Sequence, residues 1–413
     1  MPNAETIVIV GAGQAAVQAV DALKRQGFAG RLVVVGEERE APYQRPPLSK
    51  KFLAGELALE RLALRPASFY AEARAELRLA TRAEALDVVA HELTLDGGER
   101  LPYDRLLIAT GAVPRRLPVP GSALEGVHVL RTVADVTKIR AGLGAGRRVV
   151  VAGGGYIGLE VAATCRGLGL EVDVLEMADR LMNRVVAPPV SAFYAAEHAR
   201  AGVGIHLGTQ VSGFVASAQD PSRVGAVETR DGRRFAADLV IVGVGVAPET
   251  ALAESAGIEL ENGIRVDEQC RTSAPDVFAA GDCASHPSLR FARRVRLESV
   301  DNAFEQGKTA GANLLGQALV HDKVPWFWSD QFDLKLMIAG LNFDADRLLV
   351  RGDPASRSFA CCYLRGTELL ALDCVNSPKD YLAGKKLIEA RAHVDPARLA
   401  DPTIALKDAA APP

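Results

Sequence analysis

Two glycine-rich stretches are the parts of this chain best suited to chemistry. Residues 11–16 read GAGQAA and residues 153–158 read GGGYIG, and each follows a short β-branched apolar run and precedes a helical pattern. In such a turn the first glycine makes the bend, the second lets the backbone approach a pyrophosphate, and the third position packs helix on strand. The start of the following helix offers unpaired N–H groups to the phosphates. Because strand, turn and helix occur together twice, we expect two bound dinucleotides.

An acidic residue follows each of these units at a similar distance. Glu176 lies 18 residues after Gly158, and Glu37 lies 21 residues after Ala16, close to the roughly 20 residues expected for an acid that binds ribose hydroxyls. Either acid alone could be a solvated residue at a strand end, but two in matching places favour ribose recognition. A carboxylate repels a 2′-phosphate, so we expect the second site to prefer NADH to NADPH.

The elements that position these turns alternate along the chain. Strands are expected at residues 6–10 and 32–35, with a helix between them that ends near Gly27, and the same order returns at 148–152, 160–166 and 172–175. This alternation predicts an α/β fold with doubly wound parallel sheets, as two Rossmann-like dinucleotide-binding domains. Residues 103–111 and 237–245 share one strand pattern and bracket the second repeat. We therefore expect the two domains to be nested.

The expected domain boundaries follow from this nesting. Residues 1–111 and 245–322 would form the first dinucleotide-binding domain and residues 112–244 the second, inserted into it. From residue 323 the pattern changes to alternating strands such as 359–364, with a helix near 385–392. Residues 323–413 should therefore form a small α+β domain with antiparallel strands.

Composition excludes several classes of protein. The 413 residues are 48% apolar and 24% charged, which argues against a disordered, fibrous or membrane-spanning chain. The formal net charge of −3 gives no overall attraction for nucleic acid or anionic lipid. Residues 1–5 contain no basic region, so a cytoplasmic location is expected. The cysteines at 165, 270, 283, 361, 362 and 374 lack metal-ligand spacing, and we expect reduced, buried thiols and no metal.

Three further stretches carry a resemblance to a known family. They are residues 43–50 (YQRPPLSK), the apolar strand that ends in Gly281-Asp282, and residues 326–331 (WFWSDQ). With the nested dinucleotide repeats, they make nearly the whole chain resemble the FAD-dependent, NADH-oxidising ferredoxin reductases, which include the reductase components of ring-hydroxylating dioxygenases. The resemblance implies a glutathione-reductase-like fold with FAD, NAD and C-terminal domains.

The resemblance also implies which residues bind the two cofactors. Those expected to bind FAD are Gly11, Gly13, Ala15, Glu37, Arg45, Lys50, Ala83, Arg131, Asp282, Val300 and Trp328. Those expected to bind NADH are Gly153, Gly155, Ile157, Gly158, Glu160, Glu176, Arg184, Gly245 and Glu298. Arg184 could instead be a solvated loop charge. Lys50, Glu160 and Trp328 are the expected catalytic residues, although packing alone would also explain Trp328.

The chemistry expected at this site is electron transfer. FAD accepts a hydride from NADH and can release electrons singly. A lysine near the flavin would stabilise its reduced, anionic form, and Lys50 could pair with Glu160; the alternative is an ordinary exposed surface lysine. No cysteine precedes Cys165, so a redox-active Cys-x4-Cys pair beside the flavin is absent from the sequence. Electrons are therefore expected to leave the flavin directly for an external acceptor.

The expected acceptor is an acidic 2Fe-2S ferredoxin that supplies an oxygenase, either a haem monooxygenase or a ring-hydroxylating dioxygenase. Arg290, Arg293, Arg294 and Arg296 form the densest basic cluster and could guide that ferredoxin, or be solvated loop charges. Two alternatives remain open at this point. One is an NADH-dependent reductase of monodehydroascorbate or a quinone, and the other is a flavoprotein interaction module like apoptosis-inducing factor.

Overall fold

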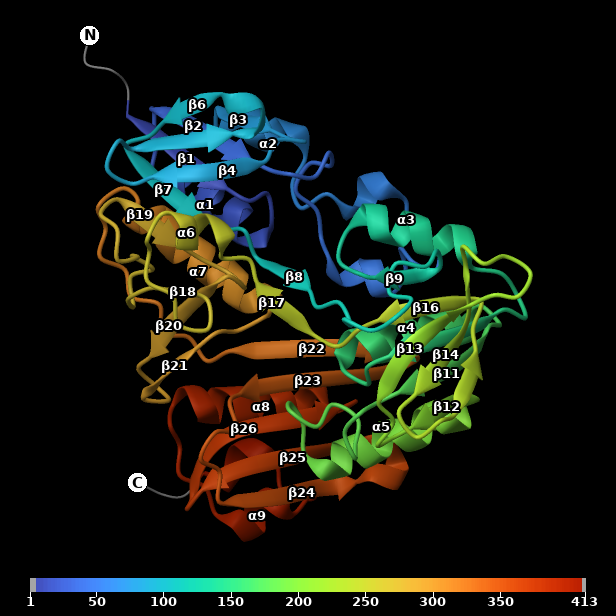
Figure 1. Cartoon of the computed structure of the whole chain (residues 1–413). Helices are drawn as coiled ribbons and strands as arrows, with labels where there is room; N and C mark the ends of the chain where they lie inside the picture. The colour runs from blue at the N-terminus through green and yellow to red at the C-terminus, as the bar shows by residue number, and fades with distance from the viewer. Residues whose placement is uncertain (1–4, 411–413) are drawn as a thin grey trace. The chain divides into compact units, whose positions relative to one another are not determined.

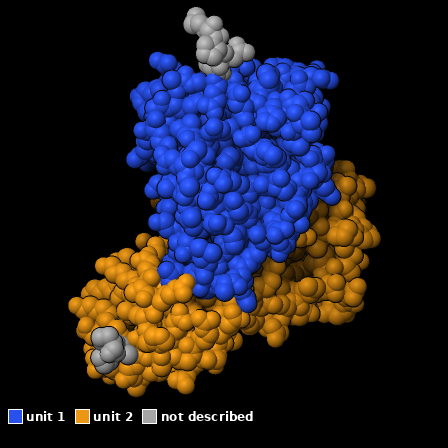
Figure 2. All heavy atoms as spheres, turned by 90° about the vertical axis from the view of Figure 1, so that its left-hand side faces the viewer, with its two compact units in different colours: residues 1–44, 59–113, 247–325 blue, residues 45–58, 114–246, 326–413 orange. Residues whose placement is uncertain are grey.

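The computed structural model describes residues 5–410 and divides the chain into two compact units. The first unit comprises residues 1–44, 59–113 and 247–325, and the second comprises residues 45–58, 114–246 and 326–413 (Figure 2). The expected cytoplasmic location was based on residues 1–5. Of these, residues 1–4 lie outside the described residues. The three-domain division expected from the sequence stays a prediction.

The first unit is built on a parallel five-stranded sheet in the order β19-β7-β1-β2-β3 (Figure 1). Strand side chains alternate between its two faces. Ile7 and Ile9 pack in one core with α1 and α7, while Val8 and Val10 pack in another with β4 and β5. The strands are β1 (Thr6–Val10), β2 (Arg31–Val35), β3 (Ala75–Arg78), β7 (Arg105–Ile108) and β19 (Val277–Ala279).

Smaller elements cover this sheet. The helices are α1 (Gln14–Arg25), α2 (Ala67–Glu72), α6 (Ala251–Ser255) and α7 (Val300–Asn313). Two small sheets are formed by β4 (Ala83–Asp87), β5 (Glu92–Leu95) and β6 (Arg100–Pro102), and by β18 (Ile264–Arg265), β20 (Ala284–Ser288) and β21 (Arg293–Val295). β8 (Ala112–Pro114) pairs with β17 (Val246–Pro248).

The second unit contains a second parallel five-stranded sheet, in the order β12-β11-β10-β16-β9. Its strands are β9 (Val127–Val129), β10 (Arg148–Ala152), β11 (Glu171–Leu175), β12 (Val203–His206) and β16 (Leu239–Val242). The antiparallel strands β13 (Val211–Ala216), β14 (Val224–Thr229) and β15 (Arg234–Ala236) share a core with it. Its helices are α3 (Val133–Gly142), α4 (Tyr156–Gly167) and α5 (Pro188–Arg200).

The second unit also holds an antiparallel five-stranded sheet, in the order β22-β23-β26-β25-β24 (orange to red in Figure 1). Its strands are β22 (Trp326–Gln331), β23 (Leu334–Gly340), β24 (Arg347–Asp353), β25 (Ser358–Arg365) and β26 (Glu368–Val375). Helix α8 (Pro378–Glu389) packs on β23 and β26, and α9 (Pro396–Ala400) on β24. The expectation of α/β sheets followed by a small antiparallel α+β region is confirmed.

One expected element was misplaced along the chain. The last long helix was expected near residues 385–392, but α8 begins at Pro378 and ends at Glu389. A proline in the first turn does not break a helix, since its missing N–H group would have no helical partner there, and Asp380 suits the positive end of the helix dipole. The sequence reading used the apolar residues and missed this N-terminal signal.

The six cysteines are all buried and free, which confirms the expectation of reduced, buried thiols. Burial raises the pKa of the Cys165 thiol to about 12. Within residues 5–410, no helix is both long enough and apolar enough to cross a membrane.

Candidate functional site

The first glycine turn joins β1 to α1 in the first unit. Gly11 has a φ of +109°, and a Cβ there would lie 2.2 Å from the carbonyl oxygen of Ala109, so only glycine fits. Gly13 caps α1, and no side chain bonds to the N–H groups of its first turn. No heavy atom would lie within 4 Å of a Cβ on Gly13. Free N–H groups beside open space fit a pyrophosphate.

A second turn in the same unit lies against the start of α1. Gly281 precedes Asp282 with a φ of +87°, and a Cβ there would lie 3.3 Å from the Cβ of Ala15. The N–H of Gly281 donates to Gln306 Oε1 at 2.8 Å, which ties this turn to α7. The structure thus brings Asp282 next to the Gly11–Ala15 turn, as the expected FAD residues require.

Helix α7 supplies a further sign of a ligand in the first unit. It begins at Val300, directly after its cap Ser299. The buried atom Gln306 Nε2 has no hydrogen-bond partner in the described part of the chain. Buried polar atoms usually have a partner, so a bound group or water is expected near the start of this helix.

Two further FAD candidates of this unit, Glu37 and Ala83, are separated from the Gly11–Ala15 turn in the sequence but lie close to each other. The Glu37 side chain is 72% exposed and lies 3.6 Å from the guanidinium of Arg82. Ala83 follows Arg82 and starts β4. Glu298, expected at the NADH site, forms an ion pair at 2.7 Å with Arg296 in the same unit.

The second glycine turn, in the second unit, repeats the first closely. Gly153 has a φ of +116°, and a Cβ there would lie 2.4 Å from the Gly243 carbonyl oxygen. Its N–H donates to Leu175 O at 2.8 Å, just as the Gly11 N–H donates to Val35 O at 2.8 Å. A Cβ on Gly158 would lie 2.1 Å from Gly153 O, whereas a Cβ on Gly155 would meet open space. This turn also fits a dinucleotide pyrophosphate.

Glu176 is fixed at this second turn. Its Oε2 accepts a hydrogen bond from the N–H of Gly154 at 2.6 Å, and its Oε1 accepts one from the N–H of Ala178 at 2.7 Å. Ile157, in the first turn of α4, is exposed. A Cβ on Gly245, which has a φ of +105°, would lie 3.5 Å from Arg184 Nη2. The structure therefore brings Arg184 and Gly245 together.

Lys50 and Glu160 form an ion pair within the second unit, as the sequence suggested. Lys50 Nζ lies 2.6 Å from Glu160 Oε2, and their side chains are 20% and 6% exposed. The alternative of an ordinary surface lysine is therefore excluded by its surroundings. Thr164 Oγ1 donates to the carbonyl oxygen of Ser49 at 2.8 Å, so the segment carrying Lys50 is anchored on α4. Arg45 Nη1 donates to Arg131 O at 2.7 Å, which joins two further FAD candidates.

Two serines at this ion pair were missed by the sequence reading. Ser49 Oγ donates to Glu160 Oε2 at 2.5 Å, and Ser329 Oγ on β22 donates to Glu160 Oε1 at 2.8 Å. Both lie in stretches that had been singled out, 43–50 and 326–331, but no spacing in the sequence links them to residue 160. Trp328 neighbours Ser329 on β22, and its ring lies 5.4 Å from that of Trp326.

The arginine cluster in the first unit is partly used inside the fold. Arg294 Nη1 donates to the carbonyl oxygens of Val266 and Ser285, and its Nε lies 3.2 Å from Glu261. Arg296 pairs with Glu298. Arg293 is the exposed member of the cluster.

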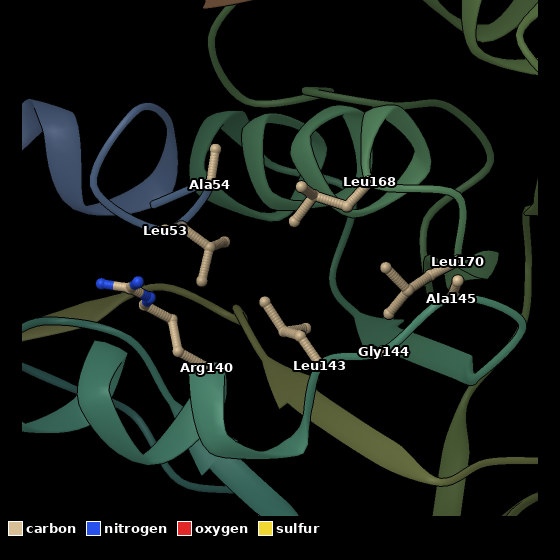
Figure 3. Close-up of a pocket in the computed structure, with 8 residues that line it drawn as sticks. All are labelled: Leu53, Ala54, Arg140, Leu143, Gly144, Ala145, Leu168 and Leu170. Carbon is tan, nitrogen blue, oxygen red and sulfur yellow. The ribbon is translucent and has the colours of Figure 1, made fainter. Parts of the chain in front are cut away.

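None of the candidate residues lines a hollow of about 240 Å³ in the second unit (Figure 3). Apolar side chains and one arginine line it, namely Leu53, Ala54, Arg140, Leu143, Gly144, Ala145, Leu168 and Leu170. It lies at the end of α4 opposite the glycine turn, so it is not the dinucleotide site.

Residues 5–307 match the family described as pyridine nucleotide-disulphide oxidoreductase, and residues 326–410 match the one described as reductase C-terminal. The chain is 45% identical to the 5,5′-dehydrodivanillate O-demethylase ferredoxin reductase subunit of Sphingobium sp. (strain NBRC 103272 / SYK-6), over 99% of this chain and 98% of that one.

Two further matches extend over nearly the same length. The chain is 43% identical to putidaredoxin reductase of Pseudomonas putida, over 98% of this chain and 96% of that one. The crystal structure of a covalent putidaredoxin reductase–putidaredoxin complex matches with a TM-score of 0.94 and 42% identity, over 98% of this chain and 97% of that one.

Proposed function

Because the chain belongs to the pyridine nucleotide-disulphide oxidoreductase family, we propose that it passes electrons from NADH through FAD to a 2Fe-2S ferredoxin. It is an oxidoreductase whose cofactors are FAD and NADH. The named relatives are ferredoxin reductases of oxygenase systems. By the same likeness, the ferredoxin would supply a haem monooxygenase or a ring-hydroxylating dioxygenase.

The observation that carries this proposal is the position of the cysteines in the chain. A disulphide reductase of this fold needs a reactive cysteine pair beside the flavin, but no cysteine precedes Cys165. The six cysteines are buried, and desolvation raises the pKa of both Cys165 and Cys362 to about 12. Thiols held in the protonated form are poor nucleophiles. An external acceptor is the remaining destination for the electrons.

The residues named above have distinct parts in this mechanism. The Gly11–Ala15 turn and Asp282 would hold FAD, with Glu37 on the adenosine ribose, while the Gly153–Gly158 turn and Glu176 would hold NADH. Bound FAD can accept a hydride and release electrons one at a time. Lys50 would place a positive charge that can stabilise negative charge on the bound flavin, and Glu160 holds that ammonium group in one position.

Arg293, with Arg290 and Arg294, is proposed to guide an acidic ferredoxin. Arg293 is exposed, whereas Arg294 makes bonds within its own unit. Long-range attraction of this kind raises association rates and weakens with salt. Since NADH is an intracellular reductant and the thiols are unpaired, we also place the enzyme in the cytoplasm, which cell fractionation can test.

Two measurements test the proposal. Rapid reduction of the bound flavin by NADH is expected in stopped-flow absorbance, followed by turnover that depends on an added 2Fe-2S ferredoxin. Turnover of a quinone or monodehydroascorbate at the same or higher efficiency would contradict the ferredoxin assignment. Slow flavin reduction with no turnover would favour an interaction protein instead.

The docking surface has its own test. Arg293→Ala should lower kcat/KM for ferredoxin several-fold at low salt and flatten its salt dependence, with flavin reduction by NADH unchanged. Lys138→Ala, an exposed cation on α3, serves as the matched control. Equal salt dependence in wild type and the Arg293 variant would remove this role.

A further inference from the structure

We propose that His198, Gln331 and Ser329 form a directional hydrogen-bond chain that positions the Glu160 carboxylate against Lys50 for flavin reduction. The inference rests on the proposed function. It adds three positioning residues, none of which the sequence reading assigned. All of them lie within the second unit.

The chain runs through consecutive short contacts. His198 Nε2 lies 2.9 Å from Gln331 Oε1, Gln331 Nε2 lies 3.2 Å from Ser329 Oγ, and Ser329 Oγ lies 2.8 Å from Glu160 Oε1. The other carboxylate oxygen, Oε2, faces Ser49 and Lys50. Helix α5 thus connects through β22 to α4.

Every member of this chain is shielded from water. His198 and Ser329 are fully buried, Gln331 is 1% exposed and Glu160 is 5% exposed. A carboxylate removed from water requires donors on its oxygens. Glu160 has three, which are the Lys50 ammonium and the hydroxyls of Ser49 and Ser329. Loss of one donor would leave part of the charge uncompensated, because no water can replace it without a change in packing.

The contacts fix the direction of each bond. An ionised carboxylate only accepts, so the single hydroxyl proton of Ser329 must point to Glu160. Ser329 Oγ must then accept from the Gln331 amide nitrogen, which leaves Gln331 Oε1 as an acceptor. An amide oxygen cannot donate, so His198 must carry its proton on Nε2.

The other side of the imidazole agrees with this tautomer. His198 Nδ1 is buried without a hydrogen-bond partner within residues 5–410. A ring nitrogen that carries no proton can be left unpaired at a lower cost in free energy than an N–H group. Burial lowers the pKa of His198, so the ring is neutral near neutral pH. If Gln331 turned over, its oxygen would accept the Ser329 proton and draw it away from Glu160. The histidine therefore selects the amide orientation that supports the carboxylate.

The expected consequence is a change in rate and not in NADH affinity. A carboxylate held at both oxygens keeps the Lys50 ammonium in one place, and small displacements of a positioned charge are costly in a preorganised site. None of the three residues lies at the glycine turn or at Glu176, which would bind the nucleotide. A role limited to folding would instead alter stability and leave the rate of the loaded enzyme unchanged.

The test compares Ser329→Ala with the rescue variant Ser329→Thr. Ser329→Ala should slow the limiting rate of flavin reduction by NADH about tenfold, the effect of one lost hydrogen bond to a charged group, and should shift the flavin midpoint potential downwards. The Kd for NADH should stay within about twofold, as expected when only the rate step is affected. Ser329→Thr should restore both the rate and the potential.

A matched control and a second variant keep the test decisive. Ser377→Ala removes a hydroxyl that donates to the Asp380 carboxylate, also at 2.8 Å and in the same unit, and should leave both readouts unchanged. If Ser329→Ala does not fold, Gln331→Leu tests the same chain by removing the donor to Ser329.

One readout needs no turnover. In ¹⁵N-histidine NMR of the flavin-loaded protein, His198 should show its proton on Nε2. A proton on Nδ1, or an unchanged flavin reduction rate in a folded variant, would overturn the inference. Ferredoxin takes no part in these measurements, so failure of the ferredoxin assignment would leave them intact, whereas a wild type that NADH does not reduce would refute the proposed function itself.

Discussion

At the scale of single residues, two acids in equivalent sequence positions have different surroundings. Glu176 accepts two backbone hydrogen bonds at its glycine turn, whereas Glu37 is largely exposed and lies near Arg82. The charge of Glu176 is therefore held at the second glycine turn, where we propose that NADH binds, with no cation paired to it in the described residues. Cofactor choice should depend on this one side chain.

We expect wild type to favour NADH over NADPH by about 100-fold in kcat/KM, since a fixed carboxylate close to a 2′-phosphate repels it by a few kcal/mol. Glu176→Gln should reduce this preference about tenfold, because it removes the charge and keeps the shape. Glu37→Gln is the matched control and should leave the preference unchanged. Equal efficiency with both nucleotides in wild type would show that Glu176 does not face the ribose.

Asp373 on β26 is a second residue whose charge state depends on burial. Desolvation raises its pKa to about 7, against hydrogen bonds from the Tyr363 hydroxyl and the Ala187 N–H, which lower it. The folded state therefore binds more protons than the unfolded state between about pH 4 and pH 7. Its contribution to stability is present at low pH and is lost as the pH rises through 7.

Asp373→Asn should consequently stabilise the protein more at pH 8 than at pH 5, by about 2–3 kcal/mol. Guanidinium unfolding at the two pH values measures the difference. Asp408→Asn, at an exposed position, should show no such pH dependence. A larger gain at pH 5 than at pH 8 would contradict the raised pKa.

At the scale of elements, the first glycine turn depends on close contact between α1 and α7. A Cβ on Gly307 would lie 2.2 Å from the carbonyl oxygen of Ala15, and one on Gly311 would lie 2.7 Å from the Cα of Ala19. Two glycines four residues apart thus let the backbones of α1 and α7 come into direct contact. The same α7 carries Gln306, which binds the turn before Asp282.

Gly307→Ala should force the helices apart, with a stability loss of about 1–3 kcal/mol, and should lower the ratio of bound flavin to protein. Thermal unfolding and flavin absorbance measure the two effects. Gly167→Ala, in α4 with open space at the Cβ position, should be neutral or stabilising by up to about 1 kcal/mol. Full flavin content and unchanged stability in the Gly307 variant would show that the contact can relax.

At the scale of the whole molecule, buried histidines dominate the response to mild acid. Burial lowers the pKa of His198, His286 and His321, and that of His321 to about 3. The unfolded state binds more protons than the folded state below about pH 6.5, so stability falls as the pH decreases from there. The raised pKa of Asp373 changes stability with pH in the opposite direction, but three buried histidines outweigh this single carboxyl group.

The midpoint of thermal unfolding should therefore rise between pH 5 and pH 6.5 and change little between pH 7 and pH 8. His321→Asn should reduce this slope, because it removes the group with the largest stated shift. Differential scanning calorimetry across this range provides the measurement. A midpoint that is highest at pH 5 would contradict the account.

The sequence alone determined the two glycine turns, the strands and helices that flank them, the antiparallel C-terminal sheet and the lack of a redox dithiol. These features depend on residues close together in the chain, because a glycine turn, its helix and its acid lie within about 20 residues. The start of α8 was missed although Pro378 and Asp380 marked it locally.

Only the tertiary structure decided how Glu160 is held and which of the two acids is fixed in place. Ser49 and Ser329 are 111 and 169 residues from Glu160 in the chain, and no local pattern encodes a contact at such separation. Whether a carboxylate is exposed, as at Glu37, or buried and bound, as at Glu160, depends on which distant elements pack over it. That packing decides the charge, the hydrogen bonds and hence the chemistry available at each position.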